Sequence, residues 1–241
     1  MRYVLVTGAS GDIGSACVLK LAKKGYSVYC HYYQQENKIT SLINDLQQLY
    51  PKQDFFAIQA DLSQESDVNR LVDSLFQLHA IVFAHGGTVY KLLTDTTEAE
   101  MQFLWDTHLK QPIRLCQLCQ SSLTKQSSSQ IVFISSVYGL IGSSMEVMYS
   151  TVKGAQISFV KAYAKEVASM NLTVNSIAPG AVETQMNALW TENEKYELIS
   201  EIPLNRLAHP EEIASLVTYL LSEDATYMTG SVIPITGGWT L

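Results

Sequence analysis

The chain has 241 residues, of which 47% are hydrophobic, and its formal net charge at pH 7 is -7. This length is enough to bury a large core in one domain, which we expect to span residues 1–241. No stretch approaches the roughly 20 uninterrupted apolar residues of a membrane span, and an acidic chain without a basic cluster argues against a nucleic-acid partner.

The first predicted strand, residues 3–7, is apolar and begins at the start of the chain, which leaves no room for a signal peptide and predicts a cytoplasmic protein. It runs directly into Gly8-Ala-Ser-Gly-Asp-Ile-Gly14 and then into a helical pattern over residues 15–24. Strand, glycine-rich turn and helix are typical of a nucleotide site, because pyrophosphate can approach bare backbone amides at the positive end of the helix. We therefore predict nucleotide binding here, in preference to a purely structural turn.

Strand-like runs alternate with helical patterns along the rest of the chain. The predicted strands are 27–32, 55–59, 80–84, 130–135, 172–177 and 232–236, and the predicted helices are 36–50, 66–77, 97–122, 148–170 and 210–221. Strands that are apolar throughout indicate a parallel sheet covered on both faces. The pattern predicts an α/β fold, a single doubly wound Rossmann-type domain with a mostly parallel seven-stranded sheet flanked by helices on both faces. We expect residues 1–135 to form its cofactor-binding half and residues 136–241 its catalytic and substrate half.

The four cysteines, Cys17, Cys30, Cys116 and Cys119, do not suggest a disulfide framework in a chain of this length. Cys116 and Cys119 form a C-x-x-C pair, but the pair stands in a predicted helix with no second ligand pair nearby. Buried core cysteines are therefore favoured over a zinc or redox site, and we predict no metal site.

Tyr149 and Lys153 stand four residues apart in the predicted helix 148–170, behind an apolar run that ends in Ser135 and Ser136. Residues at i and i+4 share a helix face, so the lysine cation can lie beneath the tyrosine ring and favour phenolate. A tyrosine with an ordinary pKa of about 10 needs such help to act as acid or base near neutrality. A lone Y-x-x-x-K is more often a surface pair, so the hypothesis depends on Ser136 and on the glycine-rich turn.

Together these motifs resemble the short-chain dehydrogenase/reductase family over nearly the whole chain. The similar segments are Thr7 to Gly14, Asp61-Leu62, the set Ser136, Tyr149 and Lys153, and Asn175 to Gly180 with Val182 and Thr184. The final part, with Pro203-Leu-Asn-Arg206 and Pro210-Glu-Glu-Ile-Ala214, is most similar to the 3-oxoacyl-acyl-carrier-protein reductases. The resemblance implies that the cofactor is bound by Gly8, Ser10, Gly11, Asp12, Ile13, Gly14, His31, Tyr32, Asp61, Leu62, Ala84, Gly86, Tyr149, Lys153, Pro179, Gly180, Val182 and Thr184.

The activity that the resemblance implies is an NADP-dependent reduction of a ketone to a hydroxyl by hydride transfer. In it Tyr149 donates the proton, Lys153 holds the cofactor ribose and lowers the pKa of Tyr149, and Ser136 hydrogen-bonds the substrate oxygen. By resemblance the substrate is a 3-oxoacyl thioester, as in fatty acid biosynthesis. The alternative is a carbonyl reductase or alcohol dehydrogenase for another small apolar substrate. A non-catalytic dinucleotide-sensing protein is a third hypothesis, against which the intact set of Ser136, Tyr149 and Lys153 argues.

Three positions depart from the family pattern. Asp12 replaces a glycine of the cofactor loop, where a carboxylate near phosphates is unfavourable unless it points away or caps the helix, while Gly11 supplies flexibility one position earlier. His108 stands at the place of a fourth catalytic residue, an Asn that acts through its backbone carbonyl in a proton relay. His108 is therefore a candidate for that role, or adds a titrating group to the relay. In Phe83-Ala-His-Gly86, which replaces Asn-Asn-Ala-Gly, we expect His85 to be structural.

The choice between NADP and NAD depends on charge at the end of the second strand. An acidic residue there would favour NAD by repelling a 2′-phosphate, and the sequence has His31-Tyr32-Tyr33 instead, which favours NADP. NAD stays the alternative, because Gly11 occupies the place where many NADP-dependent relatives have an Arg. The positive partner for the phosphate is then either missing or supplied by His31 or Lys38.

The segment 183–202, with Met186, Leu189, Trp190 and Tyr196, is expected to be an apolar lid over an acyl chain or another apolar ketone. An acyl-carrier protein is a candidate partner, but it is acidic, and the charge of this chain opposes its docking. The resemblance further implies a homo-oligomer, a tetramer or otherwise a dimer, in which the predicted helices 97–122 and 148–170 pack between subunits.

Overall fold

The computed structural model describes residues 2–185 and 190–239, and within them seven strands form one sheet in the order β3-β2-β1-β4-β5-β6-β7. Every neighbouring pair is parallel. The strands are β1 (Arg2–Thr7), β2 (Tyr26–Tyr32), β3 (Phe55–Gln59), β4 (Ala80–Phe83), β5 (Ser129–Ile134), β6 (Leu172–Pro179) and β7 (Val232–Ile235). The predicted seven-stranded doubly wound sheet is confirmed, and it is parallel throughout.

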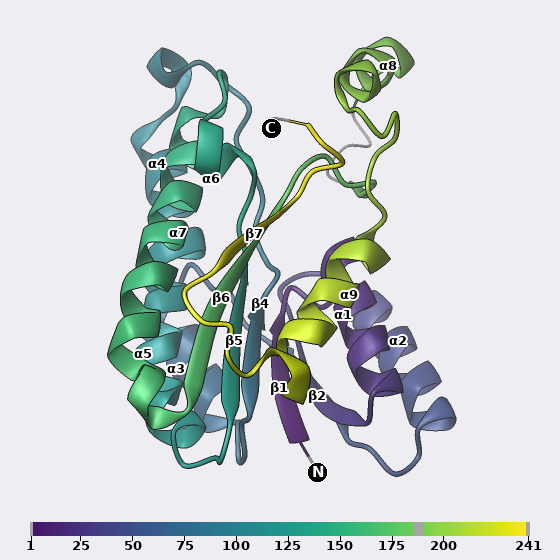
Figure 1. The fold of residues 1–241 in the computed structure, drawn as a ribbon, viewed down its shortest axis with the longest axis vertical. Helices are drawn as coiled ribbons and strands as arrows, with labels where there is room; N and C mark the ends of the chain where they lie inside the picture. Colours follow the sequence, from purple (N-terminus) through teal and green to yellow (C-terminus); the bar gives the residue numbers. More distant parts are fainter. Residues whose placement is uncertain (1, 186–189, 240–241) are drawn as a thin grey trace.

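Helices cover both faces of the sheet (Figure 1). One face carries α1 (Asp12–Lys23), α2 (Glu36–Leu49) and α9 (Pro210–Leu220), and the other carries α3 (Glu65–Asp73), α5 (Gln111–Leu123) and α7 (Val147–Val167). Each face has its own core, because successive strand residues point to opposite sides. In β1, Val4 and Val6 belong to the core beneath α1, whereas Leu5 belongs to the core beneath α5 and α7.

The single long helix predicted over residues 97–122 is wrong, because a π-helical turn interrupts it. The chain forms α4 (Glu98–Trp105), the π turn η2 (Asp106–Lys110) and then α5. A π turn frees backbone carbonyls from the regular helical ladder, and such turns are frequent at functional sites. Here the freed carbonyls of Thr107 and His108 accept hydrogen bonds from the side chains of His85 and Gln156.

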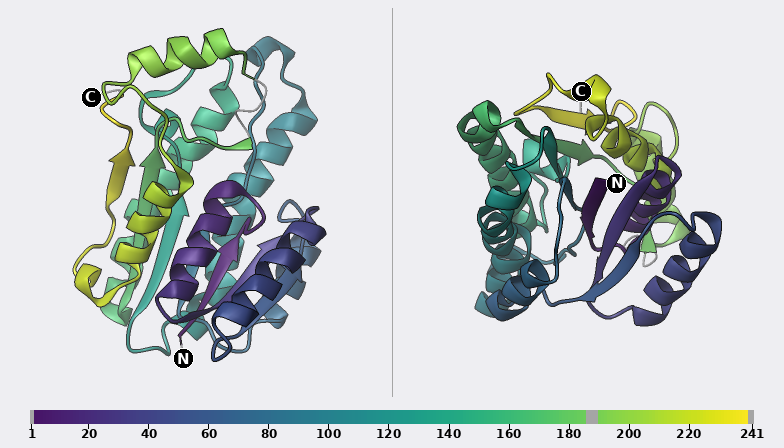
Figure 2. Two further views of the ribbon diagram at one scale, coloured as in Figure 1. Left: turned by 90° about the vertical axis from the view of Figure 1, so that its right-hand side faces the viewer. Right: turned by 90° about the horizontal axis from the view of Figure 1, so that it is seen from below.

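Two helices that the sequence did not predict, α6 (Tyr138–Ile141) and α8 (Glu192–Glu201), lie beyond the carboxyl ends of the strands (Figures 1 and 2). Three short 3-10 turns complete the described elements: η1 (Leu93–Asp95), η3 (Ala168–Met170) and η5 (Glu223–Ala225). The predicted helix 148–170 therefore ends as α7 followed by η3, at Asn171, which has a φ of 58°. The short helices α6 and α8 and the loops beside them lie around the carboxyl end of the sheet, where ligands bind in open α/β folds.

The four cysteines are buried and unpaired, as predicted for core residues. Cys116 and Cys119 pack in the core between the sheet and α5. Among the described residues, no helix is both long enough and apolar enough to cross a membrane.

Candidate active site

The predicted site residues gather at the carboxyl ends of β1 to β6 and on the adjoining η2 and α7. Between β1 and β4 the strand order reverses direction, since β1 leads to β2 on one side and has β4 on the other. In open α/β sheets ligands bind at such a reversal. The glycine-rich turn leaves β1 there, and Ser136 follows β5.

The glycine-rich turn is closed tightly by two of its glycines. Gly8 has a φ of 69°, and a Cβ on it would lie 2.6 Å from the backbone of His85. A Cβ on Gly14 would lie 2.1 Å from the carbonyl oxygen of Gly8. Only glycine fits these two positions, so the turn brings bare backbone to the start of α1.

Gly11 has an ordinary extended conformation, with a φ of -78°, so the flexibility expected of it is not used. It is the N-cap residue of α1, and within the described residues no side chain caps this helix. The first amide groups of α1 therefore face outward at the positive end of the helix dipole, beside Ser10 and Ile13. This is the arrangement that binds phosphate.

Asp12 points away from the turn, which is one of the two arrangements expected to relieve its charge. Its Oδ2 accepts a hydrogen bond from the backbone amide of Gln185 at 2.7 Å, and its Oδ1 lies 3.6 Å from Nζ of Lys38. The carboxylate is thus occupied by a backbone donor and a cation, and it leaves the amides of α1 open.

His31 cannot supply the positive charge considered for a 2′-phosphate. Its Nδ1 accepts a hydrogen bond from the amide of Gly8 at 3.0 Å, and its Nε2 lies 3.0 Å from the carbonyl oxygen of Ala60. Burial lowers the pKa of His31 to about 4, so the ring is neutral near pH 7. His31 instead fixes the start of the glycine-rich turn.

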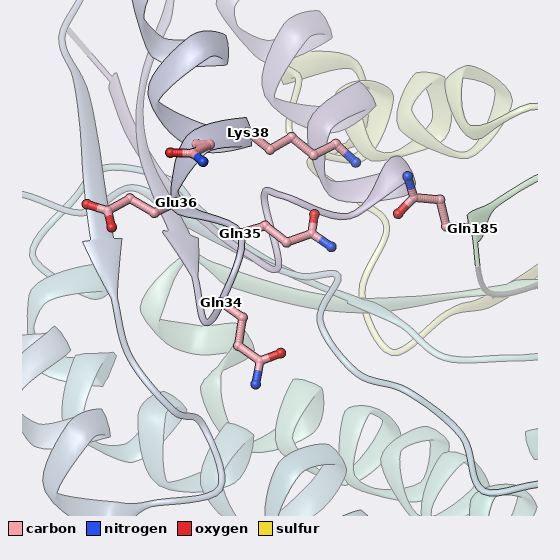
Figure 3. Close-up of a pocket in the computed structure, with 6 residues that line it drawn as sticks. Gln34, Gln35, Glu36, Lys38 and Gln185 are labelled. Carbon is pink, nitrogen blue, oxygen red and sulfur yellow. The ribbon is translucent and has the colours of Figure 1, made fainter.

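A cavity of about 510 Å³ opens where β2 ends and α2 begins (Figure 3). It is lined by Gln34, Gln35, Glu36, Asn37, Lys38 and Gln185. Figure 3 shows the Lys38 ammonium directed toward Gln185, whereas the Glu36 carboxylate points to the opposite side. Among these lining residues the amides and Lys38 offer hydrogen-bond donors to an anion, and of these only Lys38 was predicted from the sequence.

Several of the predicted cofactor residues are engaged in holding the backbone around the site. Oδ1 of Asp61 accepts hydrogen bonds from the amide and hydroxyl of Ser63, while Tyr32 and Leu62 are buried in the two cores. The amide of Ala84 donates to the carbonyl of Thr7 at 3.2 Å. Their contacts fix the backbone at the carboxyl ends of β1, β3 and β4.

The end of β6 is tied to both of its neighbours. The carbonyl of Pro179 accepts from the amide of Val137, and the amide of Gly180 donates to the carbonyl of Ile235, each at 2.8 Å. Val182 is buried and bridges to Ala208. Thr184 follows in a partly exposed stretch.

Ser136, Tyr149 and Lys153 come together as predicted. Nζ of Lys153 lies 5.5 Å from the centroid of the Tyr149 ring and donates a hydrogen bond to the carbonyl of Ile134 at 2.9 Å. Oγ of Ser136 accepts from the amide of Tyr138 at 3.1 Å, which fixes it at the start of α6. A hydroxyl, a phenol and an amine therefore face one space at the end of β5.

The ionisation of the pair differs from the expected one. Burial raises the pKa of Tyr149, the Glu146 carboxylate raises it further, and the hydrogen bond with Ser136 opposes the shift. Burial also lowers the pKa of Lys153 to about 7. The pKa of Tyr149 is therefore raised by burial instead of lowered by Lys153, which favours the protonated phenol, the form needed to donate a proton.

His108 lies against Tyr149 in an edge-to-face arrangement, with ring centroids 5.5 Å apart. Its Nε2 lies 2.8 Å from the carbonyl oxygen of Gly87, and its Nδ1 is buried with no hydrogen-bond partner among the described residues. Burial lowers its pKa well below the ordinary value, and the Lys153 charge lowers it further. Its backbone carbonyl, expected in a proton relay, already accepts a hydrogen bond from Nε2 of Gln156 at 2.5 Å.

Gly86 leaves room for the ring of His108, because it has no side chain. Gly86 has a φ of 133°, and a Cβ there would lie 2.1 Å from Cε1 of His108. His85 is structural, as expected: its Nδ1 lies 2.6 Å from Oγ1 of Thr7, and its Nε2 lies 2.9 Å from the carbonyl oxygen of Thr107. The histidines thus tie the glycine-rich turn to the π turn.

Three side chains around this space were not predicted from the sequence. Glu146 stands three residues before Tyr149, a helical spacing that could have identified it. Tyr138 and Trp239 contact each other edge to face at 5.9 Å and come from opposite ends of the second half of the chain. Nothing in their separate motifs indicated that contact.

Two of the four residues expected in the apolar lid, Trp190 and Tyr196, lie among the described residues. Trp190 is partly exposed and Tyr196, on α8, is 75% exposed. Met186 and Leu189 lie outside the described residues. Thr191 caps α8 by accepting a hydrogen bond from the amide of Glu194, so the helix begins where the sequence provides a capping box.

Comparisons with known proteins agree with this geometry. A family model described as enoyl-(acyl carrier protein) reductase matches residues 8–240. The Bacillus subtilis protein described as uncharacterized oxidoreductase YmfI is 41% identical over 239 residues, covering 99% of this chain and 98% of that protein. The 3-oxoacyl-[acyl-carrier-protein] reductase FabG of Staphylococcus aureus is 32% identical over 98% of this chain and 97% of its own, and that of Thermotoga maritima is 33% identical over the same shares.

Solved structures share the fold. The structure of YwfH, described as an NADPH-dependent reductase involved in bacilysin biosynthesis, superposes with a TM-score of 0.93 at 23% identity, covering 99% of this chain and 98% of that one. L-sorbose reductase from Gluconobacter frateurii, complexed with NADPH and L-sorbose, gives a TM-score of 0.90 at 24% identity, covering 99% and 96%. With its sheet order and its convergent Ser136, Tyr149 and Lys153, the chain belongs to the short-chain dehydrogenase/reductase family of oxidoreductases.

Proposed function

We propose that the protein is an NADPH-dependent reductase that converts a ketone into a secondary alcohol. The observation that carries this proposal is the convergence of the Tyr149 phenol, the Lys153 amine and the Ser136 hydroxyl beside the glycine-rich turn. The nicotinamide would supply a hydride to the carbonyl carbon. The protein's own side chains would hydrogen-bond the carbonyl oxygen and protonate it.

Ser136 donates a hydrogen bond to the substrate oxygen, and Tyr149 delivers the proton to it. Because burial raises the pKa of Tyr149, the phenol keeps its proton at neutral pH until the proton is transferred to the substrate oxygen. Once the proton leaves, the ammonium of Lys153 beneath the ring stabilises the phenolate by its charge.

The preference for NADP rests on the cavity at the end of β2. Its only cationic side chain among the lining residues is Lys38, and no carboxylate stands at the end of β2 in His31-Tyr32-Tyr33. Binding of NADPH by the structural neighbours, as their descriptions state, supports the same choice. NAD is the alternative.

The substrate class proposed is a 3-oxoacyl thioester, supported by the 32% and 33% identity to reductases that carry that description. We expect the acyl chain to contact exposed apolar side chains, which include Tyr90, Leu92, Leu140, Ile141 and Leu204. The alternative is another small apolar ketone. We further propose a cytoplasmic homotetramer, or otherwise a dimer, in which the exposed Phe103 and Trp105 of α4 are covered.

The test is NADPH oxidation with acetoacetyl-coenzyme A, by wild type, Tyr149→Phe and the remote control Tyr219→Phe. Tyr149→Phe keeps the shape but removes the transferable proton, so turnover should fall about 100-fold or more while NADPH binding persists. Undiminished turnover in Tyr149→Phe would contradict the assignment. Turnover of simple ketones but not of the thioester would favour the alternative substrate class.

A further inference from the structure

Glu146 lies beside the reacting groups but has no part in the proton transfer described above. It is the N-cap residue of α7, three residues before Tyr149, and so shares a helix face with it. Its side chain makes no capping hydrogen bond to α7, so it does not serve the common role of such a residue.

The backbone before Glu146 is held in an unusual conformation. Met145 has a φ of 64°, in the left-handed region that a methionine seldom adopts, and its carbonyl accepts a hydrogen bond from the amide of Lys91 at 2.7 Å. Strain of this kind persists only where surrounding contacts fix it, and it concentrates at functional sites. The loop after β4 therefore fixes the direction in which Glu146 leaves the chain.

The same loop holds one oxygen of the carboxylate. Oγ1 of Thr88 donates a hydrogen bond to Oε1 of Glu146 at 2.5 Å. Oε2 has no hydrogen-bond partner within residues 2–185 and 190–239. Oε2 is also not fully buried, so solvent or a ligand can reach it.

Glu146 lies close to two phenols. Its charge raises the pKa of both Tyr149 and Tyr138, in each case as the second cause after burial. Glu201 adds a second negative charge at Tyr138, whereas the amine of Lys153 lies beneath the ring of Tyr149. Lys91, the basic residue of the adjoining loop, is paired with Glu100 instead.

We infer that Glu146 determines substrate specificity: it accepts a hydrogen bond from an N–H or O–H group of the substrate near the ketone, and it disfavours a substrate with a carboxylate or phosphate at that place. This inference rests on the proposed function, since it names which ketones the Tyr149 site takes. A site built to hydrogen-bond a substrate group rejects analogues that lack it, because its own polar atom is then left unpaired. A hydrogen bond to a charged group is worth about 1.5–3 kcal/mol, or roughly 10- to 100-fold in kcat/KM.

The experiment compares three ketones of nearly equal size: acetoacetamide, which has N–H donors, methyl acetoacetate, which has none, and acetoacetate, which is anionic. Wild type should have a kcat/KM for acetoacetamide at least about 10-fold above that for methyl acetoacetate, with acetoacetate poorest. Glu146→Leu should reduce the ratio of amide to ester to near one. Glu146→Gln, which keeps the shape and an acceptor but removes the charge, should raise kcat/KM for acetoacetate.

The matched control is Glu65→Gln, which removes an exposed carboxylate from the first turn of the remote helix α3 and should leave every ratio unchanged. Folding of both Glu146 variants is checked by thermal unfolding. Ratios of amide to ester that are the same in wild type, Glu146→Gln and Glu146→Leu would overturn the inference.

A binding measurement separates this inference from the proposed function. Calorimetry with NADP present gives the affinities of 3-hydroxybutyramide, methyl 3-hydroxybutyrate and 3-hydroxybutyrate without any turnover. If no ketone is reduced but the amide binds best and loses its advantage in Glu146→Leu, the proposed reaction fails and the role of Glu146 stands. If ketones are reduced but the three alcohols bind alike, the reaction stands and the role of Glu146 fails.

Discussion

Lys153 is a buried amine that donates a hydrogen bond to the carbonyl of Ile134, and no carboxylate within residues 2–185 and 190–239 forms an ion pair with it. Burial lowers its pKa from an ordinary 10.5 to about 7. Its charge state therefore changes near neutrality, whereas Tyr149 stays protonated throughout that range. At the residue scale, the pH dependence of catalysis should belong to Lys153.

Reduction should therefore slow as pH rises through about 7, because the phenolate left by proton transfer loses the neighbouring ammonium. In Lys153→Arg the guanidinium stays charged, so activity should be lower but the decline near pH 7 should vanish. The measurement is kcat for ketone reduction between pH 5.5 and 9. An identical decline in Lys153→Arg would assign it to another group.

The same shift has a consequence for stability. Between about pH 7 and 10.5 the unfolded chain holds a proton on Lys153 that the folded chain has released. The contribution of Lys153 to the free energy of unfolding must then rise with pH across that window, and the full penalty of burying the charge applies below it.

At the scale of single elements, the π turn η2 depends on side chains that lie far away in the sequence. The carbonyl of His108 is satisfied by Gln156 on α7, and that of Thr107 by His85 after β4. These donors hold η2 against α7 and hold the ring of His108 against Tyr149. The turn is thus part of the support of the site.

Gln156→Leu should lower the free energy of unfolding by about 1–3 kcal/mol, because it leaves the buried His108 carbonyl unpaired. Gln117→Leu, on the exposed side of α5, is the control and should change stability little. Urea unfolding measures both. A Gln156→Leu protein as stable as wild type would show that the carbonyl finds another partner.

The elements could be predicted to different degrees. Apolar runs such as Ala80–Phe83 identify strands by themselves, and Tyr149 with Lys153 is visible because both lie on one helix within a few residues. The break of the helix at Asp106 could not be predicted, since the side chains that donate to the carbonyls of the π turn, His85 and Gln156, lie far away in the sequence. The contact of Asp12 with Gln185 joins residues 173 positions apart, and no local pattern encodes it.

At the scale of the whole molecule, the cavity at the end of β2 joins segments from both halves of the chain, because Gln185 lines it together with the first turn of α2. Lys38 belongs to this cavity and also contacts Asp12. A ligand that binds the folded protein alone stabilises it by mass action, about 2.7 kcal/mol at 100 times its Kd. Cofactor preference should therefore be measurable as a shift in thermal stability.

NADPH should raise the Tm of wild type more than NADH at equal concentration. Lys38→Met should weaken NADPH binding about 10- to 100-fold, the value of a charge-assisted hydrogen bond, and should leave NADH binding unchanged. Lys52→Met, an exposed lysine in the turn before β3, is the control. Equal losses for the two cofactors in Lys38→Met would exclude a 2′-phosphate contact.

The π turn also changes how the stretch from α4 to α5 must be aligned. It holds one residue more than a regular helix of the same rise, and one residue corresponds to about 100° of rotation around a helix axis. The apolar residues of α4 and those of α5 therefore lie on helix faces that are rotated relative to each other by about this angle. Removal of a single residue from the π turn would align the two faces. It would rotate α4 against α5 and turn Phe103 and Trp105 toward a different side of the molecule.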